Sequence, residues 1–434
     1  MKRIVAIMLV TLIVFFILSG CKKVENEGNV ENILDMIDDK SKNSLTIYCD
    51  YMTRYIKSYD KLIIDFRLTH PDVELIVYDP TNGGTISDSD AWLKFSTDMM
   101  AGKGPDIILS DGYRFNYKSI TSGIFMDLNE FINEDSSFDI ELYDNVIMES
   151  GVFQGKRVAL PFLYTTCSLM TTRERMSELG IPLDTLKTPE GILTAFEIAD
   201  KSRQLTSNSM YWMTSYSWFE DIIDYENNTV DTNNRYLRRV IGLKKDMRDR
   251  SNFRDGGSNT KEYFDEIYKT EAFYESLVVY LTAAYYEAHD AKCEIVSVPN
   301  NHNGTTAVVY LFSLVNQNCK NKELAWEFLK CTLRESFQGS SYFLNIGLPV
   351  LKSIQDDRYS YECRHNSDGD VDFKDKMVSY ILGTRKPITN VLYEYEINDI
   401  LELVDRFEPY INDESSYDEC LAGVENYYSI YMTE

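Results

Sequence analysis

Histidine and basic residues are both scarce in this sequence. Only four histidines occur among 434 residues, and there is no HExxH, no GxSxG and no phosphate-binding loop. A metal hydrolase or a serine hydrolase therefore lacks its usual support. Lys and Arg number 44 against 69 Asp and Glu, which gives a formal net charge of −25. Because phosphate groups are bound by Lys and Arg, this charge argues against nucleic acid or anionic lipid as a partner.

Cysteines are few and lack the spacing of a metal site. The eight cysteines form no CxxC pair. Cys21 belongs to the N-terminal segment, and the others are odd in number, so at least one thiol is free. We interpret them as small buried apolar residues and leave one bridged pair open. Segment Asn366–Asp372 lacks the spacing and terminal glutamate of a calcium loop, so a solvated turn is favoured. No metal and no cofactor is predicted.

Long hydrophobic runs are absent except at the N-terminus. Two basic residues precede the apolar run Ile4–Leu18, which is short for a membrane span of about 20 residues and is typical of a secretory signal. The following Leu18-Ser19-Gly20-Cys21 resembles a bacterial lipobox, which implies a diacylglycerol on Cys21. We therefore expect a signal peptide at 1–20, a flexible tether at 21–43, and attachment to the extracytoplasmic face of the cell membrane.

The remaining chain is rich enough in apolar residues to fold as more than one body. Apolar residues make up 44 % and aromatic residues 13 % of the sequence, which excludes global disorder. Roughly 390 residues exceed what one core normally organises, so two lobes are expected. Strand-like segments at Leu45–Cys49, Val73–Tyr78 and Asp106–Leu109 alternate with helical patterns. This alternation predicts an α/β fold with a parallel sheet.

Polar and aromatic residues follow each of these predicted strands. In parallel sheets, ligands lie outside the carboxyl ends of the strands, which here are followed by the loops 50–54, 79–85 and 110–116. Each loop carries hydroxyls, carboxylates, aromatic rings or a guanidinium group, which are the groups that a polar ligand would contact. The candidate ligand contacts in these loops are Asp50, Tyr51, Ser110, Asp111, Tyr113 and Arg114.

The second half of the chain has weaker patterns. A helix is predicted to start at Lys187-Thr188-Pro189, and a mainly helical region extends to about residue 265. Strand-like runs follow at 277–282 and 294–298, and Asn321 is placed to cap a helix. From about Gly347 onward the chain is expected to be helical and acidic.

Six segments carry a resemblance to a known family by their order and spacing along the chain. They are LTIYCDYM, AGKGPDIIL, GKRVALPFLYTTCSLMTTRERMSELGI, NKELAWEFLK, IGLPVLKS and VENYYSIYMTE. Together they resemble the extracellular solute-binding proteins of ATP-binding-cassette importers, in the sugar-binding branch of maltose-binding protein. The resemblance implies two α/β lobes that are joined by a strand hinge and close around a solute like a clamshell. It implies lobe 1 from 44–162 and 292–338, and lobe 2 from 163–291 and 339–434.

The resemblance also implies further ligand contacts. A hinge-adjacent polar contact falls on Tyr164 or Thr165, and a binding strand of the second lobe falls near Tyr280, without the usual Gly-Pro-Trp. Met170-Thr171-Thr172 replaces the family's Tyr-Tyr-Asn. Trp218 is a candidate stacking residue, although core packing is the favoured interpretation of this tryptophan.

The sequence thus predicts a monomeric binding protein, without catalysis, that presents a small hydrophilic solute to a membrane permease. A carbohydrate is the expected solute. Two alternatives stay open. A surface glycosidase would need two carboxylates about 5 to 10 Å apart, and a sensing or adhesion module would use the same fold.

Overall fold

The computed structural model describes residues 43–49, 58–80, 87–205, 217–250, 272–276, 293–339, 347–356 and 388–431. Residues 41–434 form one compact unit, distinct from residues 1–40. Within the described residues, no helix is both long and apolar enough to cross a membrane. Several predictions lie outside these residues, namely the signal peptide, the lipidated Cys21, the turn 366–372 and the candidate contacts Asp50, Tyr51 and Tyr280.

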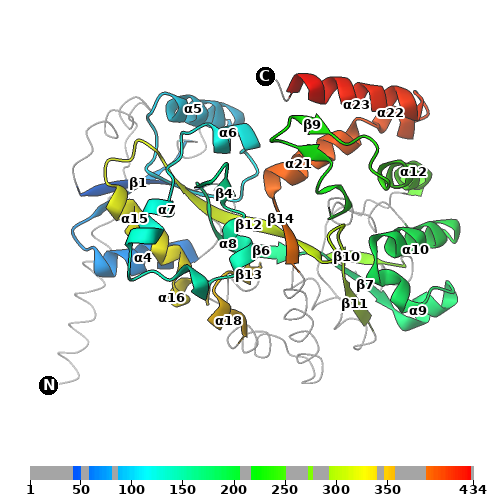
Figure 1. The fold of residues 1–434 in the computed structure, drawn as a ribbon, viewed down its shortest axis with the longest axis horizontal. Helices are drawn as coiled ribbons and strands as arrows, with labels where there is room; N and C mark the ends of the chain where they lie inside the picture. Colours follow the sequence, from blue (N-terminus) through cyan, green and yellow to red (C-terminus); the bar gives the residue numbers. More distant parts are fainter. Residues whose placement is uncertain are drawn as a thin grey trace. The chain divides into compact units, whose positions relative to one another are not determined.

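The larger sheet confirms the predicted alternation of strands and helices. Strand β1 pairs in parallel with both β2 and β3, and helices α4 and α5 connect the three strands (Figure 1). All residues of β1 and β3 are buried, as expected for parallel strands covered on both faces. The elements are β1 (Ser44–Cys49), α4 (Ser58–Thr69), β2 (Glu74–Tyr78), α5 (Asp88–Met100) and β3 (Ile107–Ser110).

The rest of this sheet is organised around one long strand, β12 (Thr305–Val315). Its second half runs antiparallel to β3 and to β6 (Leu160–Thr166), whereas its first half runs parallel to β14 (Ile388–Tyr393). Strand β13 (Leu348–Pro349) pairs with β6 at the edge. The resulting order is β13-β6-β12-β3-β1-β2, with β14 beside β12.

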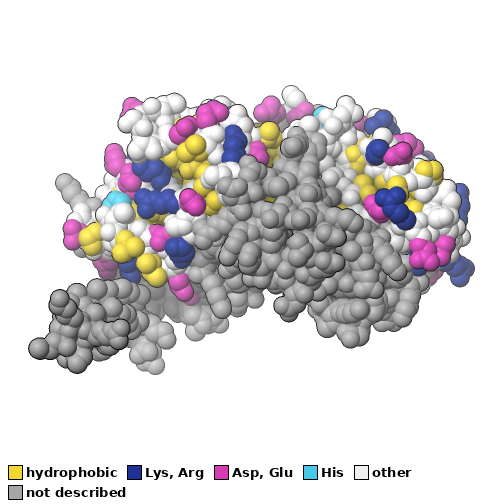
Figure 2. Space-filling model, turned by 90° about the horizontal axis from the view of Figure 1, so that it is seen from below, with side chains coloured by type: hydrophobic (Ala, Val, Ile, Leu, Met, Phe, Trp, Pro, Cys, Tyr) yellow, Lys and Arg dark blue, Asp and Glu magenta, His cyan; other side chains and the backbone are white. Residues whose placement is uncertain are grey.

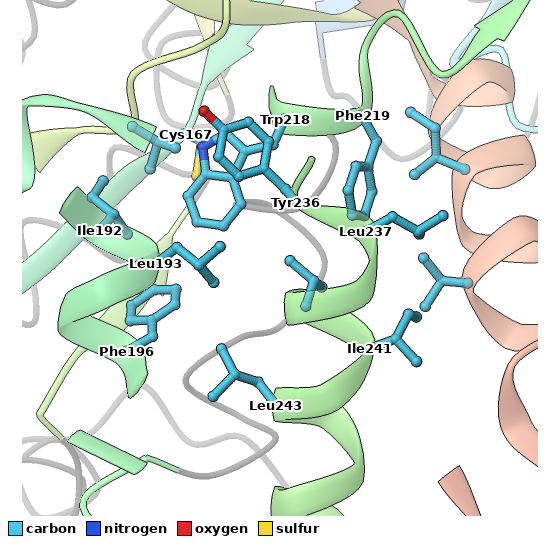
Figure 3. Close-up of a cluster of buried hydrophobic side chains, with 14 of the residues drawn as sticks. Cys167, Ile192, Leu193, Phe196, Trp218, Phe219, Tyr236, Leu237, Ile241 and Leu243 are labelled. Atoms are coloured by element: carbon cyan, nitrogen blue, oxygen red, sulfur yellow. The ribbon is translucent and has the colours of Figure 1, made fainter. Parts of the chain in front are cut away.

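A smaller three-stranded sheet has a hydrophobic cluster packed against it. Strand β7 (Ser168–Thr172) lies between β10 (Tyr274–Ser276) and β11 (Cys293–Ser297), antiparallel to both. The cluster includes buried side chains of two helices, α10 (Pro189–Lys201) and α12 (Leu237–Met247). Figure 3 shows Ile192, Leu193 and Phe196 of α10 on the side of the Trp218 and Tyr236 rings, and Leu237 and Ile241 of α12 on the opposite side, with Phe219. Helices α21 (Glu394–Asp405) and α23 (Tyr417–Tyr431) complete the cluster.

The helix starts follow local capping chemistry, with one difference from the sequence prediction. Helix α10 begins as predicted, with Pro189 in its first turn and the Thr188 hydroxyl accepting from the backbone N–H of Gly191. Ser87 caps α5, and its hydroxyl accepts from the backbone N–H of Asp90. Asn321 precedes α15 (Lys322–Leu333), but its side chain donates to the Ser44 carbonyl and does not cap the helix.

One prediction about the second half of the chain is wrong, because the region after residue 347 contains β13 and β14 as well as helices. The described residues between 187 and 250 are mainly helical, as predicted, with one short hairpin of β8 (Ile223–Asp224) and β9 (Thr229–Val230). The division into lobes stays a prediction, and strand pairing joins residues of different predicted lobes. Segment 293–297 of predicted lobe 1 pairs with β7 of predicted lobe 2, and β12 of predicted lobe 1 pairs with β14 of predicted lobe 2.

The remaining elements are short and lie between these larger ones. The cysteines whose side chains are described, at 49, 167, 319, 331 and 420, are all buried, as interpreted from the sequence. The short elements are β4 (Val152–Phe153), β5 (Lys156–Arg157), α6 (Tyr117–Thr121), α7 (Asn129–Glu134), α8 (Asn145–Glu149), α9 (Arg173–Glu178), α16 (Glu335–Gln338), α18 (Lys352–Asp356), α22 (Glu408–Ile411), and three 3₁₀ turns at Ile140–Leu142, Leu183–Lys187 and Arg248–Arg250.

Candidate ligand-binding site

The loop that leaves β3 has a backbone held by its own side chains. The Ser110 hydroxyl accepts from the N–H of Gly112 at 2.9 Å, and the Asp111 carboxylate accepts from the N–H of Tyr113 at 3.0 Å. Gly112 has φ of 82°, and a Cβ there would lie 2.9 Å from the ring of Phe312. Only glycine fits this turn without strain. These contacts fix the backbone of the loop and thereby the position of the residues that follow it.

Three predicted contacts on this loop differ in exposure. Ser110 is buried, Asp111 is partly exposed, and the Tyr113 side chain is 62 % exposed. The Arg114 guanidinium lies 5.9 Å from the centre of the Trp92 ring, within range of a cation–π contact. Tyr113 and Asp111 are thus the members of this set that present polar atoms or a ring face to solvent.

Tyrosine rings from distant parts of the chain meet beside this loop. Tyr117, at the start of α6, stacks on Tyr225 with ring centres 5.0 Å apart and an interplanar angle of 20°. The Tyr225 hydroxyl donates to the Asp399 carboxylate at 2.7 Å. Tyr395 of α21 packs edge-on against Tyr225, with ring centres 6.2 Å apart. Stacked tyrosines with anchored hydroxyls form the kind of aromatic surface that packs on a sugar ring.

Carboxylates lie among these rings. Tyr310 is the one partly exposed residue of β12, and burial, together with the charges of Glu394 and Asp111, raises its pKa to about 12. Burial also raises the pKa of Glu394, which follows β14 directly. A Cβ on Gly112 would lie 3.7 Å from the Glu394 side chain. The exits of β3 and β14 therefore bring Asp111, Tyr310 and Glu394 together.

The first turns of α21 add two more enclosed carboxyls behind this group. Burial raises the pKa of Glu396 to about 8, although its carboxylate accepts from the N–H of Tyr393 at 2.7 Å. Burial likewise raises the pKa of Asp399, against the hydrogen bond from Tyr225. Glu396 and Asp399 thus accept hydrogen bonds from Tyr393 and Tyr225. Their role is to hold these aromatic residues in position and not to contact a ligand.

Three other predicted contacts lie in the protein interior. Tyr164 and Thr165 belong to β6 and are 0 % and 3 % exposed. Trp218 is 0 % exposed, and its indole N–H donates to the Pro299 carbonyl at 3.2 Å. The structure thus gives Trp218 the packing role that the sequence favoured, and in this arrangement its ring faces only protein.

Sequence reasoning missed Tyr117, Tyr225, Tyr310 and Glu394. Tyr310 carries a usable signal, because it is the only tyrosine in an eleven-residue apolar run, TTAVVYLFSLV. Tyr225 lies in the region up to residue 265 that was predicted only as mainly helical. Glu394 had no local signal, since its position depends on the pairing of β14 with β12, some 80 residues earlier in the chain.

A pocket of different character lies away from these residues. It is lined by many acidic side chains, including Asp72, Glu130 and Glu327, together with Trp326. None of the predicted contacts lines it. In the view of Figure 2, Lys, Arg, Asp and Glu side chains are interspersed over the described surface, without a continuous basic patch on that face.

Comparison with solved structures places this architecture among two-lobe solute-binding proteins. An ABC substrate-binding protein from Listeria monocytogenes, in complex with cycloalternan, superposes with a TM-score of 0.62 at 15 % identity, covering 91 % of this chain and 100 % of that chain. The cyclic alpha-maltosyl-1,6-maltose binding protein from Arthrobacter globiformis gives 0.60 at 16 % identity, covering 90 % and 98 %. The GacH receptor of Streptomyces glaucescens, studied with acarbose, gives 0.59 at 16 % identity, covering 91 % and 100 %.

The fold is therefore α/β and of the kind found in two-lobe solute-binding proteins of the maltose-binding type. The model of the bacterial extracellular solute-binding proteins matches residues 84–360, more than half of the chain. The chain belongs to this family. No curated protein sequence matches it.

Proposed function

We propose that this protein is a lipid-anchored receptor that binds a carbohydrate at the exits of β3 and β14 and delivers it to an ABC importer. The observation that carries the proposal is the grouping of Asp111, Tyr310 and Glu394 beside the Tyr117–Tyr225 stack, in a chain of the solute-binding family. Carboxylates accept hydrogen bonds from sugar hydroxyls, and tyrosine faces cover the C–H surface of the ring.

The residues of this site come from both predicted lobes. Asp111, Tyr117 and Tyr310 belong to predicted lobe 1, whereas Tyr225 and Glu394 belong to predicted lobe 2. Ligand that contacts both sets stabilises the closed arrangement, because it binds that arrangement more tightly than an open one. A permease that recognises the closed form would then distinguish loaded from empty receptor.

Neighbouring structures suggest where a ligand search begins. The proteins with cycloalternan, acarbose and beta-1,6-galactobiose in their descriptions share the fold. A thermal-shift screen of this protein against cyclic and linear oligosaccharides, monosaccharides and polyols tests the solute class. A ligand present at 100 times its dissociation constant adds about 2.7 kcal/mol to the free energy of unfolding. The absence of any shift across all these classes would remove the carbohydrate assignment.

The site itself is tested with a matched pair of aspartates. Asp111 and Asp139 each accept a hydrogen bond from the backbone N–H two residues later, at 3.0 Å in both cases. Replacing either with alanine removes the same kind of turn contact, but only Asp111 lies beside Tyr310 and Glu394. We expect Asp111→Ala to weaken sugar binding at least about tenfold, since a hydrogen bond to a charged group contributes roughly 1.5–3 kcal/mol. Asp139→Ala leaves affinity unchanged, and equal affinities for the two variants would exclude this site.

Two further measurements separate the proposal from its alternatives. Incubation with the oligosaccharides that bind, followed by chromatography, detects the shortened products that a glycosidase would release. Fractionation of cells that express the wild type or Cys21→Ser tests the anchor. We expect wild type in the membrane fraction and the variant in the soluble extracytoplasmic fraction. Equal membrane retention of both would argue against lipidation at Cys21.

A further inference from the structure

A histidine and two carboxylates converge at a place distinct from the sugar site. One ligand-type atom from each of Glu220, Asp221 and His302 lies within 4.8 Å of the other two. The Nε2 atom of His302 is 3.0 Å from a carboxylate oxygen of Asp221 and 3.4 Å from Oε1 of Glu220. The first two residues precede β8, and His302 lies in the loop between β11 and β12.

Glu220 is fixed from both sides. The preceding residues, Trp218 and Phe219, are 0 % exposed in the hydrophobic cluster (Figure 3). Oε2 of Glu220 accepts hydrogen bonds from the Thr306 hydroxyl and, at 2.9 Å, from the Asn390 amide. The side chain of Glu220 is 0 % exposed. Carboxylates that bind metals are held in this way by hydrogen bonds from an outer shell.

The loop that carries His302 is equally constrained. The Asn300 side-chain oxygen accepts from the N–H groups of His302 and Gly304, both at 3.0 Å. Asn301 donates from its backbone N–H to Glu220 and from its side-chain amide to the Trp218 carbonyl. The side-chain oxygen of Asn301 is buried and has no hydrogen-bond partner. This loop therefore holds His302 against Glu220 and also contains an unsatisfied oxygen acceptor.

The spacing of the three side chains suits a small divalent cation. Zinc binds imidazole nitrogen and carboxylate oxygen at about 2.0–2.2 Å with tetrahedral geometry, which corresponds to ligand separations of roughly 3.3–3.5 Å. The distances from Nε2 of His302 to the carboxylate oxygens of Asp221 and Glu220, 3.0 and 3.4 Å, lie close to this range. Calcium prefers six to eight oxygen ligands, so the imidazole favours a transition-type ion. His302 and Asp221 have side chains that are 44 % and 61 % exposed, which leaves the cation accessible and one position open to water.

We propose that Glu220, Asp221 and His302 form a binding site for Zn²⁺ that is separate from the solute site. The ion would join two segments, residues 220–221 and the loop of His302, and Glu220 is in turn bonded to Thr306 of β12 and Asn390 of β14. Zinc would therefore stabilise the junction between residues 217–221 and the two neighbouring strands. The competing explanation is a metal-free ion pair between a protonated His302 and the carboxylates.

The test uses the full chain, freed of metal with a chelator and titrated with ZnCl₂ against a fluorescent zinc indicator. The two substitutions are His302→Ala and Asp221→Asn, since both side chains are exposed and neither change opens the core. His70→Ala is the matched control. His70 is a surface histidine stacked on Phe66, with ring centres 4.5 Å apart. Circular dichroism of the metal-free proteins verifies that all variants are folded.

We expect wild type and His70→Ala each to bind one equivalent of Zn²⁺ with the same affinity. Both site variants should bind this equivalent at least about tenfold more weakly, because removal of a metal-site group causes a loss of this size. That equivalent should raise the melting temperature, and EDTA should reverse the increase. Zinc held by free thiols or by surface carboxylates contributes equally to all four proteins, so it cancels in the comparison. Identical stoichiometry and affinity in all four proteins would overturn the proposal.

Discussion

Replacing Glu396 with glutamine should alter how stability depends on pH. The Glu396 side chain is enclosed at the start of α21, and burial raises its pKa from 4.5 to about 8. Glutamine keeps an oxygen that accepts from the N–H of Tyr393, where the carboxylate now accepts at 2.7 Å. The substitution therefore removes the titration of residue 396 while it retains the hydrogen bond and the volume.

The direction in which the free energy of unfolding changes with pH follows from which state, folded or unfolded, binds the proton more tightly. Below pH 4.5 the carboxyl is protonated in both the folded and the unfolded chain, so it has no effect on stability. Between pH 4.5 and about 8 the unfolded chain ionises while the folded chain stays protonated, and the free energy of unfolding falls as pH rises. With about 1.4 kcal/mol per pKa unit, the loss at pH 7 is at most about 3 kcal/mol. Between pH 5 and pH 7 it grows by about 2–3 kcal/mol.

Urea unfolding of wild type and Glu396→Gln at pH 5, 6, 7 and 8 measures this effect. The variant should gain about 2–3 kcal/mol relative to wild type between pH 5 and pH 7. Glu394 and Asp399 titrate in both proteins, so their contribution to the pH dependence of stability cancels to first order in the difference between wild type and variant. Glu408→Gln removes an exposed carboxyl of α22 and is the control. A difference between wild type and Glu396→Gln that stays constant with pH would refute the reasoning.

Two further predictions concern packing and acid stability. Trp218→Ala removes a ring that is 0 % exposed and should lower the free energy of unfolding by about 3–5 kcal/mol, measured by urea unfolding; a loss below about 1 kcal/mol would contradict its position in the core. Asp135 accepts from the Lys330 ammonium and the Trp326 indole, and these bonds hold the pKa of its carboxyl well below its usual value of 3.8. The free energy of unfolding of the wild type should therefore fall as pH falls below about 4, whereas that of Asp135→Asn should fall less over the same range. Parallel acid-unfolding curves for the two proteins would contradict the pairing of Asp135 with Lys330 and Trp326.

The first part of the fold could be predicted because its information is local. Strands β1, β2 and β3 are short apolar runs separated by helices with clear periodicity and terminators, so the parallel order follows from connection rules. The loop after β3 was placed for the same reason, and with it Ser110, Asp111, Tyr113 and Arg114. Both the first sheet and this half of the candidate site therefore depend on sequence patterns less than 75 residues apart.

The rest of the site depends on pairing between distant segments. Strand β14 has the sequence ITNVLY and runs directly into an acidic helix, so composition alone favoured helix throughout. Only its parallel pairing with Thr305–Val309 places Glu394 beside Tyr310. The exposure of aromatic residues was predicted only in part. The sequence favoured core packing for Trp218, which is 0 % exposed, but it did not determine the exposure of Tyr113, which is 62 % exposed, because burial is decided by what packs on a side chain.

The two-sided pairing of β12 restricts how this chain can vary in length. One inserted residue near Tyr310 would leave one half of the strand in register with its partners and turn every side chain of the other half to the opposite face. Natural variants should therefore keep the spacing of Thr305–Val315 fixed and accommodate insertions in exposed turns such as 412–416, between α22 and α23. The same turn is the safer place for an engineered tag or fluorescent reporter.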